Sequence, residues 1–160
     1  MSIDRATIFD ALFALISGIP QPPGVPPIWF GRRIQKSDEM QLPSVILKSF
    51  GEMDSRPHWA TPNTVTLMAN VYIYTRDSAD ANGDPDTQLF QILGAIEDAL
   101  VVPPFPGYGR QTLRFDNSGR DVYGRDLVND TWISGRVTQF SANLQEVSIT
   151  VVAIDMLATL

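Results

Sequence analysis

The clearest hydrophobic pattern in the sequence is a strict alternation over residues 64–76. Apolar side chains occupy every second position from Val65 to Ile73, and threonine, methionine, asparagine and tyrosine lie between them. Because successive side chains of a β-strand point to opposite faces, this pattern predicts one long strand with an aliphatic face and a mixed polar and aromatic face. It is longer than most strands in small domains. We therefore expect it at the centre of a sheet, with the other elements assembled around it.

A first helix is predicted near the N-terminus by apolar residues at three- and four-residue spacing. Ser2 or Asp4 can cap its start, and it is expected to end near Ser17. Gly18 then occupies the position at which a left-handed C-cap is common. The apolar stripe consists of Ile8, Ala11, Leu12, Leu15 and Ile16.

A second helix is predicted to begin after the polar turn 77–86 and to end near Leu100. Asp84 is its expected N-cap and Pro85 its first residue, because a proline at that position loses no hydrogen bond. Its apolar stripe is expected to pack on the aliphatic face of the strand at 64–76. The stripe consists of Leu89, Ile92, Leu93, Ile96 and Leu100.

Four further segments have strand patterns. A short edge strand is expected within 28–34, and a second strand is centred on 45–47, after which 51–63 is predicted to be a loop. Strands over 131–138 and 145–155 are expected to pair antiparallel. In the last of these, one face carries Val147, Ile149, Val151 and Ala153, and the other carries Glu146, Ser148, Thr150 and Val152.

The predicted order of elements is helix, two or three strands, helix, two strands, in a single domain over residues 1–160. Strands grouped between helices indicate an α+β fold, with an antiparallel-rich mixed β-sheet and two main helices packed on one face. The five prolines of residues 20–27 favour a stiff extended connector. A covering loop is the simplest role for this connector, and a docking site is the alternative. A long polar loop is expected at about 106–130.

Composition limits the kinds of protein that this chain can be. Its 160 residues suit one domain with its own hydrophobic core. The absence of cysteine excludes disulfides and thiolate chemistry. A net charge of -6 argues against a dedicated nucleic-acid-binding protein. No apolar run approaches the roughly 18 residues of a membrane helix, and no signal peptide is recognised. We expect a protein that acts without a membrane, inside the cell or in a particle assembled there.

No catalytic, cofactor-binding or metal-binding site is predicted. His58 is the only histidine, and it lies between prolines rather than beside a nucleophile and a carboxylate. The acidic turn 77–86 fits a calcium-binding EF-hand loop at Asp80, Asn82 and Gly83 but has Leu89 where that loop requires a glutamate. We expect a capped, solvated turn there, with a weak cation site as the alternative. The protein is predicted not to be an enzyme and to need no cofactor.

Arginines and tryptophans are the candidate interface residues. The arginines alternate with aspartates in and after the loop at 106–130, which favours either a solvated surface or an interface with acidic groups of a neighbouring subunit. The tryptophans are expected to be partly buried in the core or to anchor an interface. The candidates are Arg110, Arg114, Arg120, Arg125, Trp59 and Trp132.

A series of motifs spans most of the chain in a fixed order. It runs from Leu42-Pro-Ser-Val-Ile-Leu through Gly51-Glu52, Trp59, Val71-Tyr-Ile-Tyr-Thr75, Asp84-Pro-Asp86 and Ile96-Glu-Asp-Ala-Leu to Gln145-Glu-Val-Ser-Ile-Thr-Val. This order resembles the tail terminator proteins of long-tailed bacteriophages, which include the minor tail protein U-like and tail completion proteins. The resemblance rests on element order and a diffuse pattern, not on an invariant motif.

The resemblance implies a structural virion protein that forms a hexameric ring in the tail or neck, assembled in the cytoplasm of the bacterial host. Such a ring sits on the last ring of tail tube protein, stops its polymerisation and offers a surface to head completion, stopper or connector proteins. DNA passes through the ring without specific binding. The alternatives are another phage neck protein, such as a head–tail connector or adaptor, and an unrelated non-catalytic binding module that uses the groove between helix and sheet.

Overall fold

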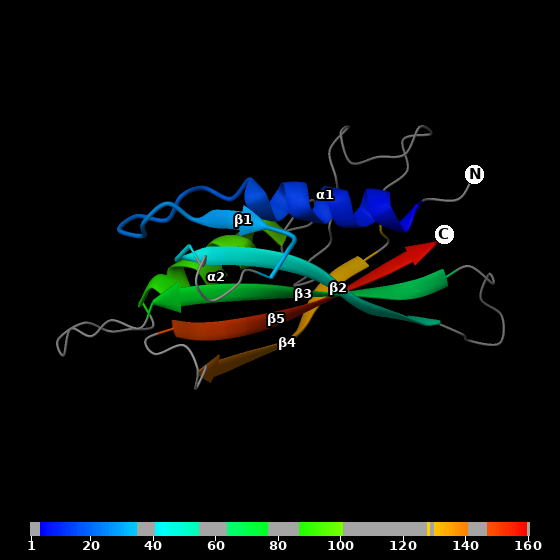
Figure 1. The fold of residues 1–160 in the computed structure, drawn as a ribbon. Helices are drawn as coiled ribbons and strands as arrows, with labels where there is room; N and C mark the ends of the chain where they lie inside the picture. The colour runs from blue at the N-terminus through cyan, green and yellow to red at the C-terminus, as the bar shows by residue number, and fades with distance from the viewer. Residues whose placement is uncertain are drawn as a thin grey trace, which may run out of the picture.

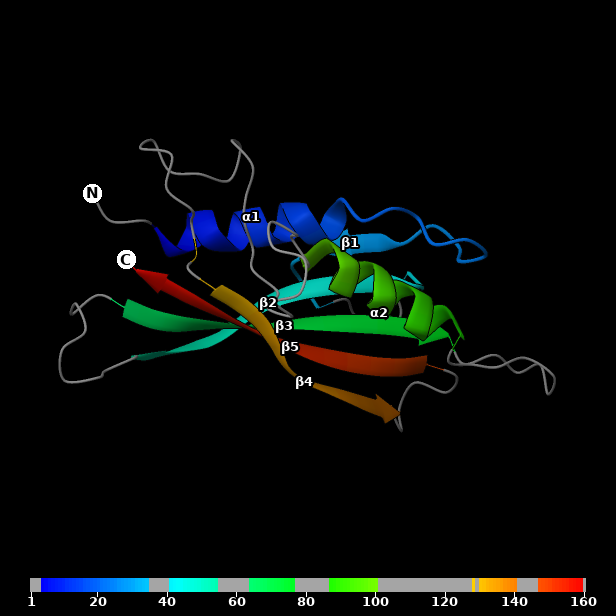
Figure 2. The same cartoon turned by 180° about the vertical axis from the view of Figure 1, so that it is seen from behind.

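The computed structural model describes residues 4–34, 41–54, 64–76, 87–100, 128, 130–140 and 147–159. These residues form the helices α1 (Arg5–Ser17) and α2 (Thr87–Leu100) and the strands β1 (Trp29–Gly31), β2 (Ser44–Asp54), β3 (Thr64–Arg76), β4 (Asp130–Phe140) and β5 (Val147–Thr159). The sheet has the order β1-β2-β3-β5-β4, in which β1 and β2 are parallel and the other pairs are antiparallel. Both helices lie on one side of it (Figure 1 and Figure 2). The expected α+β fold is confirmed.

The strand β3 is the centre of the sheet, as its alternating pattern predicts. All 13 of its residues pair with β5, and its other edge pairs with β2. Its aliphatic face, from Val65 to Ile73, is buried on the side of the helices. The predicted edge strand within 28–34 is also present, as the three residues of β1.

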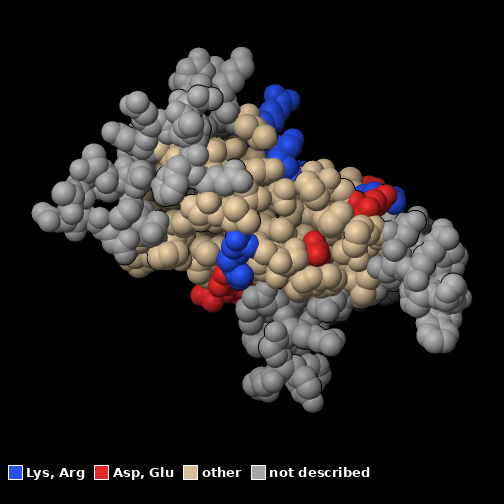
Figure 3. Space-filling view, turned by 90° about the horizontal axis from the view of Figure 1, so that it is seen from below, with Lys and Arg blue, Asp and Glu red and all other residues tan. Residues whose placement is uncertain are grey.

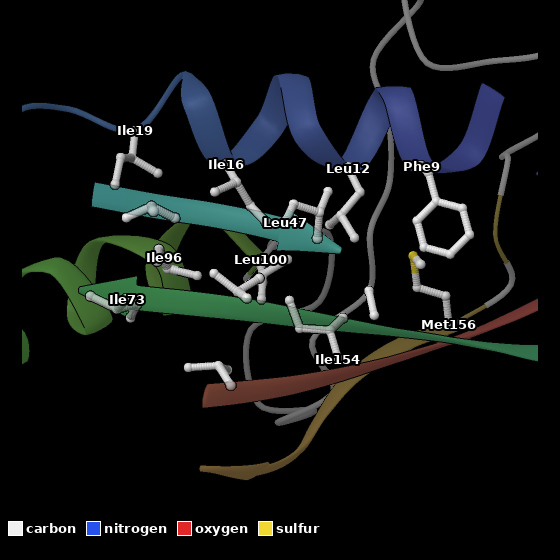
Figure 4. Close-up of a cluster of buried hydrophobic side chains, with 14 of the residues drawn as sticks. Phe9, Leu12, Ile16, Ile19, Leu47, Ile73, Ile96, Leu100, Ile154 and Met156 are labelled. Carbon is white, nitrogen blue, oxygen red and sulfur yellow. The ribbon is translucent and has the colours of Figure 1, made fainter. Parts of the chain in front are cut away.

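The hydrophobic core lies between the helices and the covered face of the sheet. Figure 4 shows side chains of α1, α2, β2, β3 and β5 converging there. Leu12 and Ile16 of α1, and Ile96 and Leu100 of α2, have no exposed surface. Burying one such aliphatic side chain contributes about 1.5–3 kcal/mol. Both helices are therefore held on the sheet by their predicted apolar stripes.

The strand β2 is longer than the sequence predicted. Residues 51–54, expected to begin a loop, continue the strand and pair with the first half of β3. A bulge adds Phe50 between the pairs Ser49–Ala69 and Gly51–Met68. Because a bulge shifts the alternation of faces by one residue, the strand pattern is broken at this point although the pairing continues.

The strand β5 also differs from its expected boundaries, since it extends to Thr159. Its helix-facing side carries Ser148, Thr150 and Val152, all of them buried, whereas Val147, Ile149, Val151 and Ala153 face away from the helices. Apolar residues occur on both sides of this strand, so alternation alone does not identify the buried side. The expected antiparallel pairing with β4 is confirmed.

The end of α1 and the proline-rich segment depart from their predicted conformations. Gly18 has a φ angle of -90°, so it does not form a left-handed cap, and its N–H donates to the carbonyl oxygen of Ala14 at 3.1 Å. The segment 20–27 is not fully extended, because the N–H of Val25 donates to the carbonyl oxygen of Pro22 at 3.3 Å. Gly24 makes this turn possible with a φ angle of 76°.

The remaining predicted boundaries lie mostly outside the described residues. These are the turn 77–86, with the expected cap Asp84 and first helical residue Pro85, and the loop at about 106–130 except for Val128 and Asp130. Asp130 is the first residue of β4, and Val128 is buried.

Replacing Ile96 with aspartate tests the position of α2. A carboxylate at a fully buried site loses its hydration, so we expect Ile96→Asp to lower the free energy of unfolding by more than about 3 kcal/mol. The matched control is Phe90→Asp on the same helix, because Phe90 is 59% exposed and its replacement is expected to cost less than about 1 kcal/mol. Urea denaturation followed by circular dichroism measures both. Equal stability of the two variants would contradict the packing of α2 on the sheet.

Candidate functional site

The structure describes one of the candidate interface residues. Trp132 lies in β4, is partly exposed and pairs with Asp155 of β5 on the side of the sheet away from the helices. The other candidates lie outside the described residues: Trp59, Arg110, Arg114, Arg120 and Arg125. Their roles as interface residues stay predictions.

The strand registers place many apolar residues on the side of the sheet turned away from the helices. Met53 on it is 60% exposed and Val137 is 55% exposed, and Lys48 and Asp155 add one charge of each sign. Figure 3, seen from below, shows that most of the described surface is neither basic nor acidic, with a few charged side chains that partly adjoin others of opposite sign. Exposed apolar surface of this kind is typical of protein contacts. We call this side the open sheet face; Ile46 on it is buried, and its exposed or partly exposed apolar residues are Met53, Met68, Tyr72, Trp132, Val137, Ile149, Val151 and Leu157.

Tyr74 lies on the open sheet face but is only 5% exposed. Its burial raises the pKa of the hydroxyl above the ordinary value of 10.0, and the neighbouring Tyr72 adds to the effect. The protonated form of the Tyr74 side chain is therefore favoured in the folded protein, where this side chain is buried.

The raised pKa of Tyr74 makes stability depend on pH in the alkaline range. Above pH 10 the unfolded chain loses this proton while the folded protein retains it, so the free energy of unfolding falls as pH rises. We expect Tyr74→Phe to reduce this fall, as measured by urea unfolding between about pH 8 and pH 11. At pH values below the ordinary tyrosine pKa, the free energies of unfolding of the natural protein and of Tyr74→Phe are expected to differ by an amount that does not change with pH. If the free energy of unfolding decreased equally in both proteins as the pH rose, the raised pKa of Tyr74 would be contradicted.

A groove of about 540 Å³ lies between the proline-rich segment and the outer side of α2. We call it the proline groove; its lining includes Pro20, Pro22, Pro23, Phe90, Gly94 and Asp98. Its proline wall is held in shape by Gln21, whose side-chain amide donates to the carbonyl oxygens of Val25 at 2.6 Å and Pro26 at 2.9 Å. Because proline also fixes φ, this wall is rigid. The groove is therefore preformed and largely apolar, with one carboxylate in its described lining.

Gly94 lies inside α2, where it lines the proline groove. A Cβ atom added to it would meet no atom within 4 Å, so no described contact requires a glycine at this position. Glycine in a helix interior costs about 1 kcal/mol relative to alanine. What the glycine provides is a deeper groove beside Phe90 and Asp98.

Replacing Gly94 with alanine tests whether the groove is open. We expect Gly94→Ala to raise the free energy of unfolding by about 0.5–1 kcal/mol, because the added methyl group favours the helix and meets open space. The contrasting control is Gly31→Ala, whose added Cβ would lie 2.2 Å from a ring atom of Trp29 and is expected to destabilise the protein. Thermal unfolding of both variants measures the difference. A destabilised Gly94→Ala variant would show that the groove is filled in the isolated protein.

The bulge of β2 produces a second feature, an exposed aromatic side chain beside two arginines. Phe50 is 68% exposed, and it borders a surface hollow that is also lined by Arg5, Arg32 and Glu52. Arg5 Nε donates to Glu52 Oε2 at 2.7 Å, and this hydrogen bond lowers the pKa of Glu52. Arg32 is paired with Asp10. Phenylalanine with arginine is a typical composition for an interface anchor, and we call Phe50, Arg5 and Arg32 the Phe50 knob.

The reactive groups weighed in the sequence lie outside the described residues, namely His58 and the turn 77–86. Within the described ranges, no group of three or more histidine, aspartate or glutamate side chains could hold a metal ion. Neither described helix is long and apolar enough to cross a membrane. The described part of the molecule thus offers surfaces for contact as its candidate functional features.

Sequence reasoning gave residues 20–27 a docking site only as the alternative role, and it identified neither the groove that this segment forms with α2 nor the Phe50 knob. The groove joins residues 20–23 to residues 90–99, which are far apart in the chain. The exposure of Phe50 follows from the bulge, which the sequence analysis did not predict. Two features of the sequence could have indicated these sites. Phe50 is an aromatic residue that interrupts a strand pattern, and Gly94 is a glycine inside an amphipathic helix.

Comparison with known proteins gives no family assignment. No protein-family model matches the sequence, and no curated protein is significantly similar to it. A function therefore has to be inferred from the fold and from these surfaces.

Proposed function

We propose that this protein is a structural subunit of a bacteriophage virion. Copies of it form a ring, expected to be a hexamer, that caps the end of the tail tube, stops tube polymerisation and provides the surface for joining the head. The observation that carries the proposal is the uneven covering of the sheet. Both helices lie on one face, while the described residues leave parts of the open sheet face, the proline groove and the Phe50 knob exposed.

The order of elements supports the same proposal. The chain forms a helix, three strands, a helix and two strands, which is the order on which the resemblance to tail terminator proteins rests. A ring also requires two different complementary surfaces on each subunit, because a closed cyclic contact of more than two copies is heterologous. The proline groove and the Phe50 knob are two such distinct surfaces.

The charge of the chain is compatible with a ring that surrounds DNA. Each subunit has a formal net charge of -6. A negative wall repels the phosphate backbone, so a duplex would pass without being held. The proposed partners are therefore other copies of this chain, the tail tube protein on one side and a head completion, stopper or connector protein on the other.

A second candidate function is a non-catalytic binding module. The proline groove favours it, because a preformed apolar groove of about 540 Å³ is a suitable site for a ligand or peptide. This groove lies on the outer side of α2, whereas the space between helix and sheet that was first considered is filled by core side chains. The number of copies in the assembled protein distinguishes the two functions, since a binding module does not need to form a ring.

The test is the effect of the purified protein on polymerising tail tube protein of the same phage. We expect six-fold rings by light scattering and negative-stain imaging, alone or on tube ends, and tubes that stop growing. The matched control is Ile96→Asp, which is expected to lose both its fold and the capping activity. A strict monomer that leaves tube length unchanged would contradict the proposal. Binding to portal or head proteins without capping would instead indicate a connector.

A further inference from the structure

We propose that copies of this chain associate head to tail, with the Phe50 knob of one copy inserted into the proline groove of the next. In this contact Arg32 of the first copy faces Asp98 of the second. The inference rests on the proposed function for the role of the resulting ring. The contact itself is defined by the described residues and is tested separately.

The two surfaces fit in their apolar character. Among the exposed large apolar residues that the structure describes, Phe50 and Phe90 are the two phenylalanines, at 68% and 59% exposure. Phe90 lines the groove with three proline residues, and the groove volume of about 540 Å³ exceeds that of a phenylalanine side chain. Insertion of Phe50 would bury both aromatic rings in one contact, and aromatic pairs gain energy beyond the area that they bury.

The two surfaces also fit in their charge. The described lining of the proline groove contains one carboxylate, that of the exposed Asp98, and no lysine or arginine. Arg32 beside Phe50 is paired with Asp10 through Nη1. A guanidinium group has five N–H donors, so Arg32 can keep this partner and donate to a second carboxylate. The knob therefore supplies a positive charge, which the described lining of the groove lacks.

The positions of the two surfaces require two copies. Arg5 of the knob lies in the first turn of α1, whereas the proline wall begins at Pro20, just after the last turn. Figure 1 shows α1 running between these ends, with α2 near its C-terminal end. The 13 residues of α1 span about 20 Å. A contact between two different surfaces is heterologous, and it produces a closed ring when the rotation between neighbours closes.

Disulfide trapping tests the geometry, since the natural chain has no cysteine. Ser49→Cys places a thiol beside Phe50, and Gln91→Cys places one in the groove lining, so the knob and the groove both stay intact. We expect a mixture of the two single variants to form a mixed disulfide dimer on oxidation, and each variant alone to form far less dimer. Dimers formed equally well by each variant alone, or no mixed dimer at the highest soluble concentration, would overturn the proposal.

A matched pair of substitutions tests the energy of the contact. We expect Phe50→Ser to weaken self-association at least about tenfold in light scattering. Ile34→Ser is the control, because Ile34 is an exposed apolar residue, at 58%, that lines neither the proline groove nor the hollow beside Phe50, and its replacement is expected to leave association unchanged. Circular dichroism confirms that both variants are folded. Unchanged association of Phe50→Ser would overturn the inference.

The outcomes separate this inference from the proposed function. Tube capping by a protein that gives no mixed disulfide would overturn the knob-in-groove contact and leave the terminator function in place. A high yield of mixed disulfide dimer from a protein that does not affect tail tubes would support the contact and contradict the proposed terminator function.

Discussion

The burial of one face of β3 is the constraint on which the rest of the structure depends. This strand pairs along both edges, so its backbone hydrogen bonds are satisfied only when β2 and β5 are in place. Its aliphatic face is removed from water only when α1 and α2 lie across it. Val71 and Ile73, with no exposed surface, show how complete this covering is. The opposite face is covered unevenly by the described residues, since Met53 and Val137 are exposed on it whereas Ile46 is buried.

The parts of the fold that could be predicted are those in which a regular pattern coincides with one-sided burial. The bounds of β3 and the buried stripe of α2 follow from alternation and from helical spacing, because one side of each element is apolar and the other is mixed. β5 is apolar on both sides, so its sequence does not report which side the helices cover. The length of β2 was underestimated because Phe50 interrupts the alternation of its side chains at the bulge. At Gly18 the glycine signal predicted a left-handed cap, whereas its φ angle is -90° and the next residue, Ile19, is buried in the core.

The candidate site was less predictable than the fold for a related reason. The arginines after residue 109 stand out in the sequence because charge is visible without knowledge of the structure. The proline groove forms only when residues 20–23 are brought beside α2, and its shape depends on a glycine that has no special role in the helix itself. The knob depends on a bulge that turns Phe50 out of the strand alternation. Surfaces formed by distant segments require the tertiary structure before they can be recognised.

The helix α2 connects the stability of the fold to these surfaces. Its buried side, at Ile92 and Ile96, holds it on the sheet, and its outer side forms one wall of the proline groove. The ion pair between Arg136 and Glu97, at 2.6 Å, also joins α2 to β4, but both side chains are partly exposed and such pairs contribute little. The groove is therefore kept in position mainly by the aliphatic core. An exposed Phe90 disfavours the isolated subunit, and this disadvantage is reduced when another chain covers the groove. The same core that covers β3 thus sets the geometry at which a second copy can bind.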